Sequence, residues 1–201
     1  TRTTSSAASD VYKRQDSTHD DLVNISVKNH YHGLDNEVAH IRKDVSFDKA
    51  KSGFMVADPL TLYDCCPTSD GASCVILAAD HVVSQFTDDP VWIRSSAAAS
   101  DYLALHDRPS ITQLMATQKA AKRAYSMAGI SAEDVDIAEV HDCFTIAELF
   151  ATEDLGFTER GTGGHFAREN RGRRNEGTTC INPSGGLKSK GHPLGATGTG
   201  Q

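Results

Sequence analysis

The sequence predicts an α/β fold, and three observations support this prediction. Apolar runs of the length of a buried strand alternate with stretches in which apolar residues recur at the 3.6-residue period of a helix. Glycine-rich loops follow two of these runs, the position at which parallel strands place a binding edge. The hydrophobic fraction of 38% is that of a globular domain with a buried core.

The first half of the chain gives the weaker signals. Residues 1–20 are rich in Ser, Thr, Ala and Asp and show no period, which predicts a disordered or non-native tail. An apolar pattern begins at Asp21, and residues 36–73 are expected to be irregular with short helices. The apolar runs at 72–80 and 91–100 then predict two buried strands.

The second half gives stronger signals. The clearest helix is predicted at 110–130, with Gly129 at its C-cap. One face of this helix carries Ile111, Leu114, Met115, Ala121, Tyr125 and Ala128. A strand at 135–140, a helix at 144–156 and a strand at 178–181 follow. This order of strands and helices is typical of a layered sheet built on crossover connections.

Composition excludes several classes of function. The formal net charge of −7 argues against a nucleic-acid partner, because such proteins need a basic face. No apolar run has the length of a membrane span, and the first residues lack the apolar core of a signal peptide. Five cysteines, an odd number, favour reduced thiols. We therefore expect a cytoplasmic protein, or a peroxisomal one in a eukaryote.

The motif EVHDCF places an imidazole near a thiol. His141 and Cys143 are two positions apart, so on an extended strand end they project to the same side. An imidazole can stabilise a thiolate and exchange a proton with it near neutral pH. The alternative is that Cys143 is a small core residue and His141 a hydrogen-bonded residue at the end of a strand.

A second motif surrounds one histidine with glycines, in the loop that follows the strand predicted at 178–181. Glycines on both sides of His192 allow the backbone to approach a ligand closely, and Pro193 suits the first position of a helix. Backbone donors beside an imidazole are the ingredients of an oxyanion site. The alternative is a tight structural turn in which the histidine has no chemical role.

Other clusters give weaker indications. Cys65 and Cys66 are expected to be buried thiols, and no paired cysteine or histidine spacing supports a metal site. The segment GTGG at 161–164 does not follow a strand and is not a nucleotide-binding fingerprint. An arginine-rich segment could meet phosphates, but such runs are more often solvated loops. Its members are Arg168, Arg171, Arg173 and Arg174.

Three motifs together resemble the thiolase family. The segment 182–198, NPSGGLKSKGHPLGATG, matches every fixed position of the thiolase signature N-x-S-G-G-x-x-x-x-G-H-P-x-G-A-T/S-G. The motif HDCF at 141–144 is similar to the one that marks the sterol-carrier-protein type of thiolase. CCPTSDGAS at 65–73 resembles a segment of that branch, which includes archaeal and bacterial acetyl-CoA acetyltransferases. The likeness runs from about Asp21 to Gln201.

The resemblance implies a thiolase-like layered fold, a mixed sheet with helices on both faces, incomplete at both ends. Residues 21–90 would be the end of the N-terminal thiolase half with part of its loop region. Residues 91–201 would be a truncated C-terminal thiolase domain. The full-length parent would be a homodimer or homotetramer, and relatives suggest assembly with another acyl-CoA enzyme.

The resemblance also implies acyl transfer on coenzyme A thioesters, either thiolysis of a 3-ketoacyl-CoA or condensation of acetyl-CoA. Coenzyme A would be a substrate, and no cofactor or metal is expected. By the matching motifs, His192 would activate the nucleophilic cysteine and help to hold the enolate oxygen. His141 would orient a water in the same oxyanion hole, and Cys143 would move the proton at the α-carbon. Substrate-binding positions would be Cys66, Ser184, Gly185, Gly186 and Gly191.

The nucleophile itself is not among the matched motifs, since no cysteine precedes Cys65. We therefore expect a fragment of a thiolase-type acyltransferase that lacks this residue and is inactive alone. A ketoacyl synthase is disfavoured because EVHDCF departs from its usual histidine context. The alternative from another class is a non-catalytic thiolase-like subunit that binds acyl-CoA or a partner enzyme.

Overall fold

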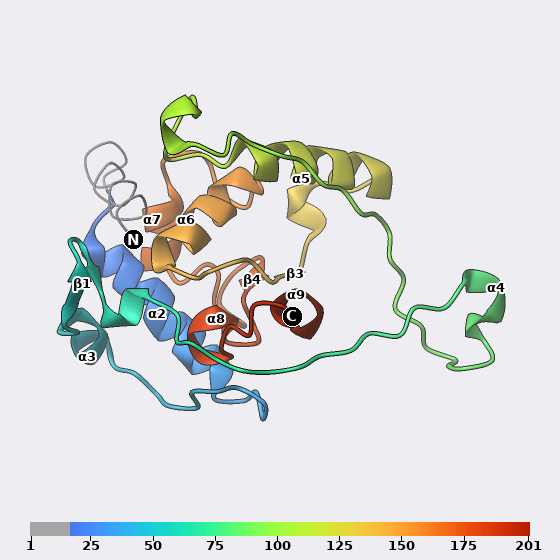
Figure 1. Cartoon of the computed structure of the whole chain (residues 1–201), viewed down its shortest axis with the longest axis horizontal. Coiled ribbons are helices and arrows are strands. Elements are labelled where there is room, and N and C mark those ends of the chain that lie inside the picture. The colour runs from blue at the N-terminus through green and yellow to red at the C-terminus, as the bar shows by residue number, and fades with distance from the viewer. Residues whose placement is uncertain (1–16) are drawn as a thin grey trace.

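The computed structural model describes residues 17–201 (Figure 1). Its helices are α2 (His19–Gly33), α3 (Phe47–Lys51), α4 (Asp80–Val83), α5 (Met115–Ala128), α6 (Thr145–Asp154), α7 (Gly163–Arg168), α8 (Gly186–Ser189) and α9 (Thr197–Gly200). Its strands are β1 (Met55–Ala57), β2 (Leu60–Thr61), β3 (Ile137–Ala138) and β4 (Cys180–Ile181). The tail predicted at 1–20 lies mostly outside the described residues, and α2 begins within its last two residues.

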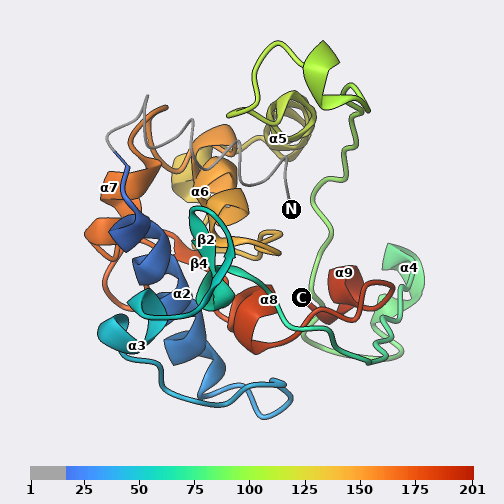
Figure 2. The same ribbon diagram turned by 60° about the vertical axis from the view of Figure 1, so that its left-hand side comes forward.

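Helix α2 is the centre of the folded body. It contacts α3, α6, α7 and α8, and Figures 1 and 2 show these elements arranged around it. The main apolar cluster joins α2 to α6 and β2, and its buried members are Leu22, Ile25, Leu60, Ile146, Leu149 and Phe150. A second cluster ties α6 and α7 to the strand β4 and consists of Val140, Ala151, Phe166 and Ile181. The body is therefore a helical layer packed over very short strands.

The parallel pair of β3 and β4 positions the two motifs. Ala138 pairs with Ile181, and the backbone N–H of Asn182 donates to the carbonyl of Ala138 at 2.8 Å. The Asn182 side chain then accepts from the backbone N–H of Val140 at 2.8 Å. Because parallel strands end at the same edge, the HDCF segment and the glycine-rich loop leave this edge together. Both strands were predicted from sequence, at 135–140 and 178–181, and both are shorter in the structure.

The two predicted helices of the second half are confirmed. Helix α5 ends at Ala128, and Gly129 caps it in the left-handed conformation with φ of 69°. Helix α6 lies within the predicted 144–156 and is buried along most of its length. No helix in the described part of the chain is long and apolar enough to cross a membrane.

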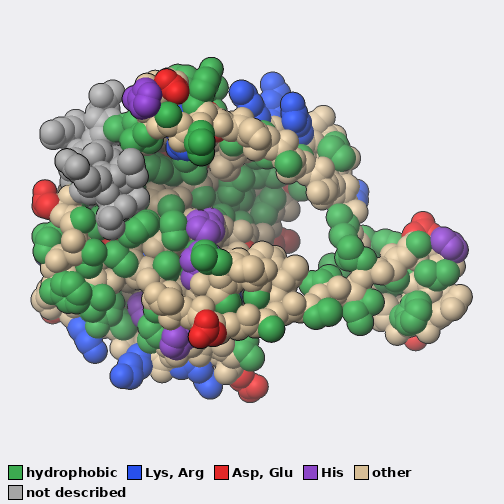
Figure 3. Space-filling model, in the orientation of Figure 1, with side chains coloured by type: hydrophobic (Ala, Val, Ile, Leu, Met, Phe, Trp, Pro, Cys, Tyr) green, Lys and Arg blue, Asp and Glu red, His purple; other side chains and the backbone are tan. Residues whose placement is uncertain are grey.

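The two strands predicted at 72–80 and 91–100 are wrong. Both segments are extended, but neither pairs with a described strand, and a short helix, α4, separates them. Figure 3 shows the middle of this arm (residues 72–100) standing away from the body with apolar side chains on its surface. The two ends of the arm contact the body, where Ser73 donates to the carbonyl of Ala196 and Ala98 accepts from Arg123. Ile76 is 90% exposed and Val91 is 98% exposed. Both segments are apolar, as a buried strand would be, but a strand forms only where a neighbouring strand provides hydrogen-bond partners for its backbone.

The arginine-rich segment is held by interactions within the chain. Arg168 contacts both carboxylate oxygens of Asp21 at 2.9 Å, and Arg174 pairs with Asp35 at 2.9 Å. Part of the segment forms α7, where only a loop was expected. Arg168 and Arg174 therefore bind carboxylates of the N-terminal region, whereas Arg173 pairs with Glu176 inside the segment at 3.1 Å.

Candidate active site

The structure brings His141 and His192 into direct contact. Their ring centroids are 5.0 Å apart and the rings are nearly perpendicular, at 79°. One ring comes from the segment after β3 and the other from the loop after β4, so the parallel strand pair explains the meeting. The sequence predicted both residues separately, and their contact is a property of the fold.

A hydrogen bond to Thr197 orients the ring of His192. The ring Nδ1 lies 2.8 Å from the hydroxyl oxygen of Thr197, and that oxygen lies 3.1 Å from the carbonyl oxygen of Pro193. Because Thr197 holds Nδ1, Nε2 is the ring nitrogen left to exchange a proton with another group.

Both imidazoles favour the neutral form. Desolvation lowers the pKa of His141, and the charge of His192 lowers it further. Desolvation also lowers the pKa of His192, with a smaller contribution from Lys190. The lowered pKa values keep both rings unprotonated at neutral pH, which is the form that a general base needs.

Cys143 lies against the CCPTSDGAS segment. Cys65 and Phe144 form an antiparallel bridge, and the backbone N–H of Cys66 donates to the carbonyl of Cys143 at 3.0 Å. Burial is the largest cause that raises the pKa of Cys143, followed by the nearby Cys66. The predicted acid/base residue thus holds its proton as a thiol. All five cysteines of the chain are free, and the described residues contain no cluster of ligands suited to a metal ion.

Asp142 fastens the HDCF segment to the glycine-rich loop. This carboxylate is fully buried and accepts the backbone N–H of Leu187 at 2.7 Å and the side-chain amide of Asn29 at 2.8 Å. Gly186 adopts φ of +57°, and a Cβ there would lie 2.4 Å from Asp142 Oδ2. Only glycine leaves room for this contact. The residue between His141 and Cys143 therefore sets where both side chains stand.

A buried polar network extends this clamp into α2 and α6. Glu148 accepts hydrogen bonds from Asn29 at 2.7 Å and Asn182 at 2.8 Å, and it pairs with Lys28 at 2.8 Å. Lys28 also donates to the carbonyl of Ile181 at 2.7 Å, at the end of β4. Burial, reinforced by Glu148, raises the pKa of Asp142. Sequence reasoning missed this network; the signal available was a run of polar residues, KNHYH, inside an apolar pattern.

The predicted substrate-binding positions fall into two groups. Ser184 is occupied by Glu139, which accepts its backbone N–H at 2.8 Å and its hydroxyl at 2.9 Å. Gly185 packs against the backbone of α2, where an added Cβ would lie 2.8 Å from the Cα of Gly33. Gly186 meets Asp142, as described above. These three residues shape the loop. Gly191 directly precedes His192 in the chain, and Cys66 lies across the backbone bridge from Cys143.

A hollow of about 350 Å³ lies beside the glycine-rich loop, and Lys190 and Pro193, on either side of Gly191 and His192 in the chain, line it. Its polar lining includes His40, Ser69 and Lys190. His40 Nδ1 lies 2.8 Å from the Ser69 hydroxyl, and a Cβ on Gly191 would lie 2.7 Å from that same hydroxyl oxygen. The hollow is thus formed where the CCPTSDGAS segment meets the loop of His192.

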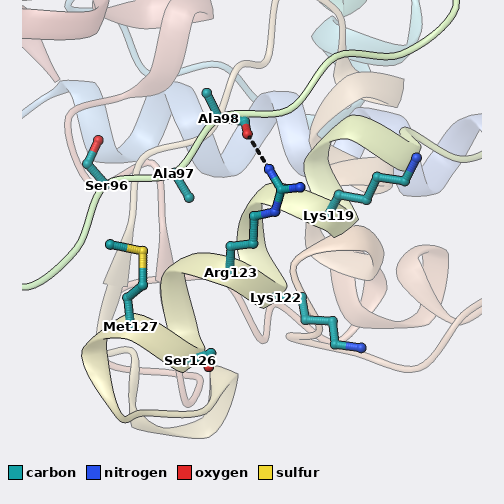
Figure 4. Close-up of a pocket in the computed structure, with 8 residues that line it drawn as sticks. All are labelled: Ser96, Ala97, Ala98, Lys119, Lys122, Arg123, Ser126 and Met127. Carbon is teal, nitrogen blue, oxygen red and sulfur yellow. Dashed lines mark hydrogen bonds between the residues drawn. The ribbon is translucent and has the colours of Figure 1, made fainter.

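A larger open hollow of about 670 Å³ lies elsewhere, between α5 and residues 96–98 of the arm. Figure 4 shows Lys119, Lys122 and Arg123 projecting from α5, with Arg123 donating to the carbonyl of Ala98 at 3.2 Å. This larger hollow is lined by none of the predicted site residues. We therefore place the candidate active site at the pair of His141 and His192.

Comparisons with known proteins identify the family of this chain. A family profile described as thiolase C-terminal domain-like matches residues 97–200, so the chain belongs to the thiolase family. It is 47% identical over 184 residues to the acetyl-CoA acetyltransferase of Methanothermobacter thermautotrophicus, an alignment that covers 92% of this chain and 48% of that protein. The chain spans about half the length of the curated acetyl-CoA acetyltransferases that it matches.

Two solved structures show the same fold. The Ltp2-ChsH2(DUF35) aldolase superposes with a TM-score of 0.88 and 21% identity, over 98% of this chain and 53% of that chain. A monomeric SCP2-thiolase like protein type 1 from Mycobacterium smegmatis superposes with a TM-score of 0.62 and 17% identity, over 87% of this chain and 36% of that chain. The chain thus has the thiolase-like α/β fold that the sequence predicted.

Proposed function

We propose that this chain forms part of a thiolase-type acyltransferase that acts on acyl-CoA thioesters. The contact between His141 and His192, on two loops that leave one edge of a parallel strand pair, carries the proposal. Its reaction is thiolysis of a 3-ketoacyl-CoA or the reverse condensation of acetyl-CoA, within a homodimeric or homotetrameric parent. We place the nucleophilic cysteine outside residues 1–201 and the protein in the cytoplasm, in keeping with its five free thiols.

The proposed roles follow from the chemistry of each group. Cys143, as thiolate, removes a proton from the α-carbon of the acyl group and becomes a thiol. The negative charge moves to the thioester oxygen, which is stabilised by hydrogen bonds from a water held by His141 and from His192 when its Nε2 carries a proton. His192 Nε2 also takes the proton of the nucleophilic cysteine when that residue attacks the acyl group. The raised pKa of Cys143 suits the return of the proton in the reverse direction.

The proton-transfer step can be tested on this chain because it does not need the nucleophile. The experiment incubates acetyl-CoA with the protein in D₂O and follows deuterium at the acetyl methyl group by mass spectrometry. We expect exchange above the buffer rate, which Cys143→Ala abolishes and His192→Ala reduces by about 100-fold. Acetoacetyl-CoA thiolysis, recorded in parallel, should be absent without the nucleophile.

Matched variants separate a chemical effect from a structural one. Cys74 is an exposed free thiol, and His106 is an exposed imidazole distant in sequence from both motifs. Cys74→Ala and His106→Ala should leave the exchange rate unchanged. Exchange that survives in Cys143→Ala would remove this residue from the proposed role, and thiolysis by the unmodified chain would show that a nucleophile is already present.

A second candidate is a non-catalytic subunit that holds acyl-CoA for a partner enzyme. A solved structure that superposes over 98% of this chain is named the Ltp2-ChsH2(DUF35) aldolase, and the arm of this chain exposes apolar residues that a partner would cover. The same exchange experiment distinguishes the two functions. Acyl-CoA binding measured by calorimetry, together with exchange at the buffer rate, would favour the binding subunit.

A further inference from the structure

Helix α8 buries a lysine beneath the thiols of the candidate site. Lys188 is 1% exposed, and its Nζ donates to the carbonyl of Asp64 at 2.5 Å. Asp64 directly precedes Cys65 and Cys66, the segment that bridges to Cys143 and Phe144. The ammonium group is therefore anchored at the start of the only described segment that pairs with the HDCF motif.

The charge of Lys188 is not neutralised in the way that the other buried lysine is. Lys28 forms an ion pair with Glu148 at 2.8 Å, whereas within residues 17–201 no carboxylate oxygen lies within 4.0 Å of Lys188 Nζ. A buried ammonium is costly and gains from any anion that lies close by. Asp142 is one such anion, because Lys188 lowers its pKa, and the thiols of Cys66 and Cys143, whose pKa values Lys188 also lowers, can supply another.

We propose that Lys188 is a positioning residue that stabilises the thiolate of Cys143 during proton transfer. The inference rests on the acid/base role given to Cys143 under the proposed function. It explains why a helix of the glycine-rich loop carries a lysine into the interior: the charge stands next to the segment whose thiol must lose a proton. Lys188 acts on Cys143 without touching the substrate.

The other charged and titratable groups around Cys143 act in the opposite direction. Burial raises its pKa most, Cys66 across the bridge raises it next, and Asp142 in its own segment also raises it. Lys188 is the group that lowers it, and it likewise lowers the pKa of Cys66. Removing the ammonium should therefore raise the pKa of Cys143 further above its ordinary value.

The test measures thiol reactivity, which is independent of turnover. Wild-type protein and Lys188→Met are alkylated with iodoacetamide from pH 6.5 to 10, and each cysteine is quantified by mass spectrometry after trypsin digestion. Trypsin places Cys143 in the peptide 124–160 of both proteins, and it places Cys180 in the peptide 175–188 of the wild type and 175–190 of Lys188→Met. We expect Cys143 to react about tenfold more slowly at pH 8 in Lys188→Met, as a shift of one pKa unit predicts. Circular dichroism confirms that both proteins are folded.

Lys28→Met is the matched control because it removes the other buried lysine. Lys28 lowers the pKa of Cys180 and is not among the groups acting on Cys143. It should slow Cys180 and leave the pH profile of Cys143 unchanged. If both substitutions merely loosened the fold, every buried thiol would react faster. An unchanged profile of Cys143 in folded Lys188→Met would overturn the proposal.

A second pair of variants covers the case in which Lys188→Met does not fold. Asp142→Asn combined with Lys188→Met removes one buried charge of each sign, and Asp142→Asn alone is its reference. Cys143 should again react about tenfold more slowly at pH 8 in the double variant than in the reference, and equal rates would overturn the proposal. Acetyl-CoA exchange is measured separately, so the proposed function can fail while the Lys188 effect on alkylation stands, and the reverse.

Discussion

The arm and the helical body distribute apolar and charged residues in opposite ways. In the arm, Ile76 is 90% exposed, although its sequence context has the pattern of a buried strand. In the body, the ion pair of Lys28 and Glu148 is almost fully buried, although charged residues usually mark a solvated face. The difference shows what each kind of element needs: a helix satisfies its own backbone and can bury paired charges, while a strand requires a neighbour.

The largest effect should come from breaking the clamp of the body. Asp142→Ala leaves the N–H of Leu187 and the amide of Asn29 without their acceptor, so we expect a loss of about 4 kcal/mol in the free energy of unfolding. Asp89→Ala, an exposed carboxylate of the arm, should change it by less than about 0.5 kcal/mol. Urea denaturation measures both. Equal losses in the two variants would erase the contrast between the regions.

The next largest effect on stability should come from apolar packing, which differs between the body and the arm. Leu149 is 0% exposed in α6, and Leu149→Ala should cost about 3 kcal/mol through lost burial and a cavity. Ile76→Ala removes a side chain that is already in water and should cost less than about 0.5 kcal/mol. A loss above about 1 kcal/mol for Ile76→Ala in urea denaturation would mean that the arm packs against something in solution.

Acid should destabilise the body through His32 and leave the arm unaffected. His32 donates from Nδ1 to the carbonyl of Asn182 at 3.0 Å and accepts the N–H of Arg174 at Nε2 at 3.0 Å, so only its neutral form satisfies both. Burial lowers the pKa of His32 to about 4. The unfolded chain then binds a proton that the folded one refuses, and stability falls as pH drops from about 6.5 to about 4.

Two variants isolate this contribution. In His32→Gln the urea midpoint should depend less steeply on pH across that window, whereas His81→Gln on the arm should follow the wild type. Asp142 has a raised pKa, so its contribution to stability grows as pH falls, opposite to that of His32. The pH dependence of each variant is therefore compared with that of the wild type. Identical pH dependence in wild type and His32→Gln would contradict the neutral assignment.

Cleavage by a protease should require less free energy in the arm than in the body. Arg94 lies exposed in an extended segment, so trypsin can cut after it without unfolding the body. We expect fragments ending at Arg94 to appear before any cleavage at the buried Lys28 or Lys188. Mass spectrometry of a brief digestion identifies the first cut. First cleavage within α2 or α8 would show that the body opens more readily than the arm.

Local signals in the sequence were enough for part of this architecture. The helix cap at Gly129 was predictable because it depends on neighbouring residues, and so were the positions of the strands β3 and β4 along the chain. The exposure of the arm was not, because pairing depends on strands far away in the chain. The network of Asn29, Glu148 and Asp142 was missed for the same reason: its hydrogen bonds join residues more than 100 positions apart.

The contact between Gly33 and Gly185 has an evolutionary consequence. A methyl group on Gly33 would lie 1.9 Å from the Ser189 hydroxyl, and one on Gly185 would lie 2.8 Å from the Cα of Gly33. We therefore expect only glycine to be tolerated at both positions, because a side chain at either one would push the loop away from α2. Leu194 is 80% exposed in the same loop, so we expect substitutions there to be tolerated. Descendants of this chain can alter the rim of the loop while inheriting an unchanged backbone around His192.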